Sequence, residues 1–184
     1  MNEANLNIRA EVLSLLMRLP TPPEESLPGG VSDSAIIAFE TSQRLTIPSC
    51  LREWLNTSNG PCVGPGGIVG LKTTRNSQNV EYILELYPVW AENGWVPIAG
   101  DGCGSYYVVV TQNDFGKGEP VVFVDVNDDN TAPAFIAASD TWRFLRFLFK
   151  KELGESNWPF AQEEVAINDP AIMSFSGVAL PWEA

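Results

Sequence analysis

The sequence contains no histidine among its 184 residues. This absence removes the commonest general base, the Ser–His and Cys–His nucleophilic pairs, and the most usual ligand of transition metals. Cysteine is also scarce, because Cys50, Cys62 and Cys103 are an odd number at wide spacings. Such cysteines form neither a zinc pattern nor a disulfide framework, and they are typical of reduced thiols. We therefore predict a cytoplasmic protein without a metal centre.

Basic residues are few. The chain has 11 lysines and arginines against 23 aspartates and glutamates, a formal net charge of −12. From Ala91 onward, fourteen acidic residues stand against five basic ones. A chain of this charge repels phosphate backbones, which argues against a nucleic-acid partner, and it attracts a basic protein. The alternative is that the negative charge only keeps the protein in solution.

Long apolar runs are absent as well. Charged residues interrupt the N-terminal segment, and no small-residue cleavage site follows them, so it does not have the pattern of a signal peptide. No apolar run approaches the roughly 20 residues that a bilayer-spanning helix needs. We expect no interaction with a membrane.

Three stretches resemble sites of chemistry, but each lacks a necessary part. Cys103 lies among glycines with no evident group to activate it. The alternate glycines from Gly100 to Gly104 precede a strand pattern, whereas a dinucleotide fingerprint precedes a helix. Residues 125–130 resemble the start of a calcium loop, but the required glycine is missing and Ile136 stands where the closing glutamate belongs. We predict no catalytic, cofactor-binding or metal-binding residue and no enzymatic activity; an enzyme using lysine or carboxylate chemistry is the remaining catalytic alternative.

What the sequence does contain is a strong hairpin pattern at residues 94–110. Two runs of β-branched and aromatic residues, 95–98 and 106–110, flank a turn with a glycine at every second position. Asp101 lies inside this turn, where its side chain can accept hydrogen bonds from nearby backbone N–H groups. We predict a central β-hairpin with Trp95 anchored in the core.

Hydrophobic periodicity and turn residues predict the remaining elements. Helices are expected at 6–19, from Ser32 or Ser34 through Glu40, at 47–55 with Asn59-Gly60 as its C-terminal cap, at 79–90 and at 139–153, and strands at 68–71, 121–126 and 134–137. Residues 21–30 have the composition of a linker, and the apolar residues after Gly154 predict a tail packed against the body. This order predicts one α+β domain over 1–184, a mostly antiparallel sheet with helices packed on one face.

The central stretch also resembles a known family. Residues 94–102, Gly-Trp-Val-Pro-Ile-Ala-Gly-Asp-Gly, resemble the signature of the SUKH superfamily, in the branch named for a fungal cell-wall-synthesis regulator. Residues 124–128 and 138–149 are similar to its later strand pair and closing helix. The resemblance spans about residues 33–152, and it departs from the family pattern at Pro61, where a glycine is typical. Three upstream pairs are similar to the family's first helices in the same order: Phe39-Glu40, Ile47-Pro48 and Asn59-Gly60.

The resemblance implies an α+β fold with no enzymatic activity and no required cofactor. In bacteria it implies an immunity protein, which binds and neutralises a cognate toxin, often a nuclease, delivered by a neighbouring or sibling cell. A nuclease usually has a basic active site, which an acidic surface can occlude with electrostatically assisted association. An intracellular scaffold or regulatory protein-interaction domain, as in the fungal branch, is the alternative.

Two sets of residues follow as site candidates. Acidic residues in turns are the candidates for binding a partner: Asp101, Asp114, Glu119, Asp128 and Asp129. Asp101 is explained more simply as a cap of its own turn, and the others as ordinary solvated turn charges. The family motif is expected to be mainly structural, and its residues are Gly94, Trp95, Pro97, Ile98, Gly100, Asp101 and Gly102.

Overall fold

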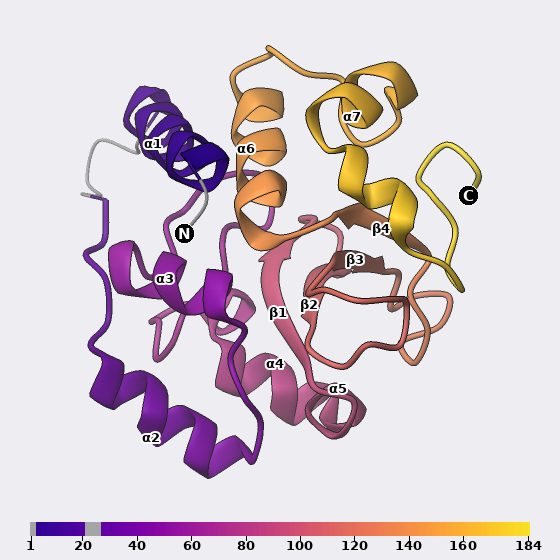
Figure 1. The fold of residues 1–184 in the computed structure, drawn as a ribbon. Coiled ribbons are helices and arrows are strands. Elements are labelled where there is room, and N and C mark those ends of the chain that lie inside the picture. The colour runs from indigo at the N-terminus through magenta and orange to yellow at the C-terminus, as the bar shows by residue number, and fades with distance from the viewer. Residues whose placement is uncertain (1–2, 21–26) are drawn as a thin grey trace.

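The structure, a computed structural model, describes residues 3–20 and 27–184 (Figure 1). The predicted linker at 21–30 therefore lies mostly outside the described residues. At the centre is one antiparallel sheet whose strands lie side by side in sequence order. These strands are β1 (Trp95–Gly100), β2 (Tyr106–Val110), β3 (Val121–Val124) and β4 (Phe135–Ala138).

The predicted hairpin is confirmed as β1 and β2. Trp95 pairs with Val110 at one end and Gly100 with Tyr106 at the other. The register shifts between Pro97 and Ala99, as happens where a strand carries an extra residue. Trp95 is only 3% exposed, as expected for a core anchor.

Helices lie against the sheet, which confirms the predicted α+β class, but they cover both of its faces and not the single face that was predicted. Neighbouring residues of a strand point to opposite faces. Tyr106 contacts Tyr87 and Trp90, which belong to the region of α4 (Val80–Leu86) and α5 (Pro88–Glu92). Tyr107 contacts Phe144 of α6 (Thr141–Glu152) on the other face. Figure 1 shows α4 and α5 below the sheet and α6 above it, so all of β2 is buried.

The helices expected from the apolar spacing at both ends of the chain are present. They include α1 (Glu3–Arg18), α2 (Asp33–Gln43) and α3 (Ser49–Thr57). α1 packs on α6 and buries Val12, Leu15 and Leu16, and Leu19 just after the helix is buried as well. α2 begins after Ser32, whose side chain accepts a hydrogen bond from the N–H of Ala35 and so caps the helix. α6 begins after Asp140, whose side chain accepts a hydrogen bond from the N–H of Arg143.

Three details of the prediction are wrong. Asn59-Gly60 does not cap α3, because the helix ends at Thr57 and the Asn59 carboxamide instead exchanges hydrogen bonds with the backbone of Leu71. The helix predicted at 79–90 is two helices, since Pro88 has no N–H to continue the first one. The strand predicted at 68–71 contributes only isolated bridges, which lie beside β1 and next to the short 3-10 helix η1 (Asn76–Gln78).

The tail packs against the body, as predicted from its apolar residues. It forms α7 (Gln162–Asn168) and the 3-10 helix η2 (Pro170–Ser174), and it buries Trp158, Val165 and Ile172. Further on, the carbonyl of Ala179 accepts a hydrogen bond from the N–H of Ile136 in β4. The tail thus covers part of an edge strand that would otherwise be open to pairing.

Candidate functional site

The turn between β1 and β2 is built around the Asp101 side chain. Its Oδ1 accepts hydrogen bonds from the backbone N–H of Cys103 at 2.8 Å and of Ser105 at 2.9 Å. Gly102 and Gly104 have positive φ angles of 84° and 105°, which glycine adopts without strain. These are the contacts that the capping interpretation of Asp101 predicts.

A second glycine-rich segment, residues 64–67, crosses this turn at very short range. A Cβ atom on Gly66 would lie 2.4 Å from the carbonyl carbon of Gly100, and one on Gly102 would lie 2.6 Å from Cβ of Pro65. Glycine is therefore required where the two backbones meet. The sequence signal for this contact is only the presence of glycines in both segments, which does not say that they touch.

The first stability prediction concerns this crossing. We expect Gly66→Ala to lower the free energy of unfolding by about 1–3 kcal/mol, because its methyl group must push two backbones apart. Gly29→Ala is the matched control, since an added Cβ there meets no atom of the described residues within 4 Å. Urea unfolding followed by circular dichroism compares the two variants. Equal stability of both would contradict the close crossing.

The crossing segments and η1 enclose a pocket of about 250 Å³, which we call the glycine pocket. Gln78 forms part of its wall, and its Nε2 donates to the carbonyls of Ile68 at 3.2 Å and Pro61 at 3.4 Å. Tyr106 lies beside it, and burial is the main cause that raises the pKa of its phenol. The pocket is lined by Cys62, Pro65, Gly66, Gly67, Arg75, Ser77, Gln78, Gly100, Gly102, Gly104, Ser105 and Tyr106.

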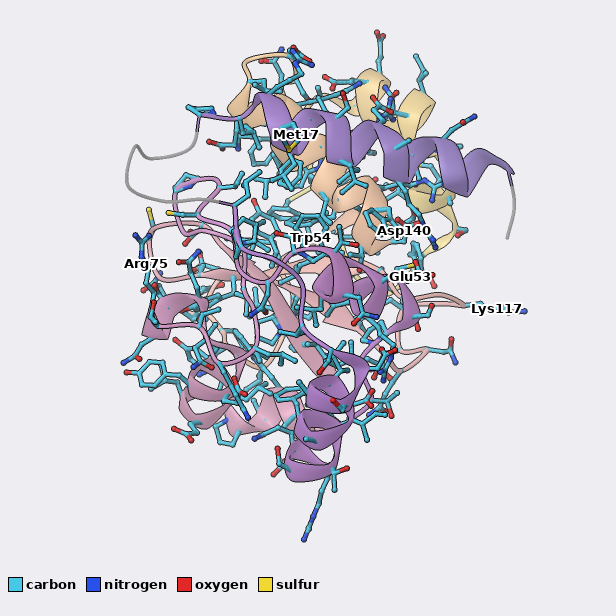
Figure 2. All side chains as sticks on the ribbon, turned by 90° about the vertical axis from the view of Figure 1, so that its left-hand side faces the viewer. Met17, Glu53, Trp54, Arg75, Lys117 and Asp140 are labelled. Carbon is cyan, nitrogen blue, oxygen red and sulfur yellow. The ribbon has the colours of Figure 1, made fainter. Side chains whose placement is uncertain are left out.

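The structure does not bring the five candidate acidic residues together. The β1–β2 and β3–β4 connections leave the same end of the antiparallel sheet, so Asp101, Asp128 and Asp129 lie there. Asp114 and Glu119 lie in the β2–β3 connection at the opposite end. Figure 2 shows this separation, since Arg75 of the glycine pocket and Lys117 of the β2–β3 connection are on opposite sides of the molecule.

Asp125 joins the first group, although sequence reasoning considered it only as part of a calcium-like loop. Its Oδ1 accepts hydrogen bonds from the N–H of Asn127 at 3.0 Å and from the hydroxyl of Ser105 at 3.1 Å. These bonds hold its pKa below the usual range, and the Thr131 hydroxyl does the same for Asp129. Both carboxylates are therefore ionised at neutral pH. We call Asp101, Asp125, Asp128 and Asp129 the acidic end.

Glu119 lies in a different setting. It lines an open cleft of about 530 Å³ together with Ser49, Asp140 and Arg143. Burial is the main cause that raises the pKa of Glu119, while hydrogen bonds from Ser49 act in the opposite direction. The cleft is of mixed charge, so Glu119 is separated from the acidic end in both place and environment.

Most of the basic charge in the second half of the chain is on α6, where Arg143, Arg146 and Lys150 form ion pairs. Arg146 and Lys150 both contact Glu11 of α1 at 2.8 Å. Arg143 pairs with Asp140 and also with Asp169, at 3.3 Å. Figure 2 shows α1 crossing in front of this part of the molecule. The excess of negative charge is thus left to other surfaces, of which the acidic end is one.

The described ranges, 3–20 and 27–184, contain neither a candidate metal site nor a candidate membrane-spanning helix. No group of three or more cysteine, aspartate or glutamate side chains there is arranged to hold a metal ion. Within the same ranges, no helix has the length and apolar character needed to cross a membrane.

Together, the meander sheet, the flanking helices and the glycine-rich signature turn define an α+β domain with a pocket beside that turn. The chain belongs to the SMI1 / KNR4 family (SUKH-1), whose family model matches residues 30–146, more than half of its length. This confirms the resemblance seen in residues 94–102. The helix α1 and the tail with α7 and η2 lie outside the matched range. Comparison with curated proteins and with solved structures gave no significant match.

Proposed function

We propose that this chain is an immunity-type protein that neutralises a cognate toxin, a basic nuclease, by binding it directly. Family membership supports this class of function. The observation that carries the proposal is the acidic end, where four carboxylates from two connections of the sheet lie at one end of the sheet, with Asp128 and Asp129 exposed. The proposed role is non-enzymatic, needs no cofactor, and is carried out in the cytoplasm.

Charge explains how such binding would work. A nuclease attracts nucleic acid with lysine and arginine side chains around its active site. Carboxylates of opposite sign steer the two proteins together, and the bound domain then excludes nucleic acid from that site. The net charge of −12 also disfavours binding of the protein itself to nucleic acid.

The direct experiment mixes the purified protein with the product of a toxin-like gene encoded beside it. We expect a tight complex whose association rate falls between about 0.05 M and 0.5 M salt, because salt screens charges separated by more than a Debye length. No complex, together with no protection when both are expressed in one cell, would overturn the proposal.

The acidic end can be tested by removing charge without removing the turn contacts. In the variant Asp128→Asn with Asp129→Asn, position 129 keeps an oxygen to accept from the N–H of Thr131. We expect affinity for the toxin to fall about 2- to 10-fold, mainly through slower association. The control removes the same charge elsewhere, with Asp114→Asn and Glu163→Gln. Unchanged affinity in the first variant would show that Asp128 and Asp129 do not contact the toxin.

The second candidate function is an intracellular scaffold or regulatory domain, as in the fungal branch of the family. It predicts several partners of different kinds and no toxin gene beside this one. Inspection of the neighbouring genes therefore discriminates between the two functions before any protein is purified.

A further inference from the structure

We propose that the glycine pocket holds a short main-chain segment of the partner protein and recognises it through its peptide groups. The inference refines the proposed function, and it rests on that function only for the identity of the partner. It is carried by the shape of the pocket and by the unpaired polar groups in its wall.

The lining allows another backbone to come close. Gly104 lines the pocket without a side chain, and glycine in such a place is typical of sites approached by a ligand or by another main chain. A Cβ atom on Gly104 would meet no atom within 4 Å, so the space beside it is open. The volume of about 250 Å³ is below the roughly 300–1,000 Å³ of ordinary small-molecule sites. A short peptide segment fits this size better than a cofactor.

Two polar side chains in the wall are almost fully buried, and each has one polar atom without a hydrogen-bond partner in the described part of the chain. Gln78 is 4% exposed and Tyr106 is 8% exposed. Because the Nε2 of Gln78 donates to two backbone carbonyls, its Oε1 is left as an acceptor. Within the described ranges, neither this oxygen nor the Tyr106 hydroxyl makes a hydrogen bond, and neither is sealed from solvent. Buried polar groups normally have partners, so both are available to a ligand.

The lining glycines also carry backbone N–H groups, which are hydrogen-bond donors. In the described part of the chain, the N–H groups of Gly66, Gly102 and Gly104 donate to no protein acceptor. The pocket wall offers the Tyr106 hydroxyl as a donor and the Gln78 carboxamide oxygen as an acceptor. A peptide group needs both, since its N–H donates and its C=O accepts.

An ionised ligand of either sign is less suited to this pocket. An anion would meet the carboxamide oxygen of Gln78, which is itself a hydrogen-bond acceptor. A cation would meet the guanidinium of Arg75, another lining residue. A neutral peptide group meets no like charge, so an uncharged peptide group is the ligand that suits this pocket.

The first test uses a small probe, N-acetylglycine N-methylamide, titrated into the protein and followed by amide NMR. We expect saturable shifts at Gly66, Gln78 and Gly102. The variant Ser77→Trp places a large side chain in the pocket from the exposed turn η1, and it should abolish these shifts. Asn76→Trp is the matched control, because Asn76 is the exposed neighbour in the same turn and does not line the pocket; it should leave the shifts unchanged.

Acetate and methylammonium serve as charged probes in parallel titrations. We expect neither to give saturable shifts at these positions. The inference is overturned if the amide probe gives none, if Ser77→Trp leaves them unchanged, or if a charged probe binds as well as the amide.

The second test uses the toxin and separates the two proposals. We expect Tyr106→Phe to weaken the complex about 5- to 10-fold, because one hydrogen bond is lost, with no change in melting temperature. Ser77→Trp should weaken the complex further, and Asn76→Trp should not. If the toxin binds the wild type and Ser77→Trp equally, the pocket inference fails while the proposed function stands. If the toxin does not bind the wild type, the proposed function fails and the amide titration alone decides the inference.

Discussion

Replacing Trp95 with alanine is expected to lower the free energy of unfolding by about 3–5 kcal/mol. Trp95 begins β1 opposite Val110 and is 3% exposed, so truncation leaves a large cavity between the sheet and the helices. Urea unfolding followed by far-ultraviolet circular dichroism measures the loss. Circular dichroism is preferable to fluorescence, because the substitution removes one of the six tryptophans.

Two control variants show which property of Trp95 matters. Its indole N–H is buried without a hydrogen-bond partner among the residues that the structure describes, so Trp95→Phe loses volume but no hydrogen bond and should cost less than Trp95→Ala. Trp182 is only partly buried and lies outside the range matched by the family, so Trp182→Ala should also cost less. An unchanged melting temperature in Trp95→Ala would show that Trp95 does not anchor the core.

Replacing Asp169 with alanine is expected to cost about 3 kcal/mol and to loosen the tail. Asp169 is fully buried between α7 and η2. Its carboxylate accepts from the N–H of Ser139 at 2.7 Å and from the Ser139 hydroxyl at 2.5 Å, and it lies 3.3 Å from Nε of Arg143. Alanine leaves these buried donors without an acceptor, and each loss costs about 1–3 kcal/mol.

Hydrogen exchange gives the local readout for this variant. We expect the amides of α7 and η2 to exchange faster in Asp169→Ala, while those of β2 keep their protection relative to the new global stability. Glu163→Ala, at an exposed position in α7, is the control and should change neither stability nor exchange. Equal exchange in both variants would show that Asp169 does not hold the tail on the body.

The parts of the fold that the sequence predicts are those with a strong local pattern. The hairpin at 94–110 combines two β-branched runs with a glycine turn, and α6 combines a capping aspartate with a continuous apolar stripe. The residues within each of these segments determine its secondary structure, so the hairpin and the helix form where the sequence pattern predicts them. The break at Pro88 was visible only as an uncertain helix end, because a proline can either kink or divide a helical segment.

The candidate site depends on contacts between distant segments, which a single sequence does not contain. Residues 64–67 meet the turn at Gly100 because both backbones lack side chains there, but nothing in either segment identifies the other. The same holds for Gln78, which enters the pocket wall through bonds to Pro61 and Ile68. The predicted acidic residues were grouped by turn composition, whereas strand connectivity places Asp114 and Glu119 at the other end of the sheet.

The proposed function requires that this protein stop a toxin by binding to it and blocking its active site. Titration of the toxin's nuclease activity with increasing amounts of the wild-type protein tests this claim most directly. We predict that activity falls in proportion to the added protein and is lost at one molar equivalent. Full nuclease activity in the presence of a large excess of the folded protein would contradict the claim.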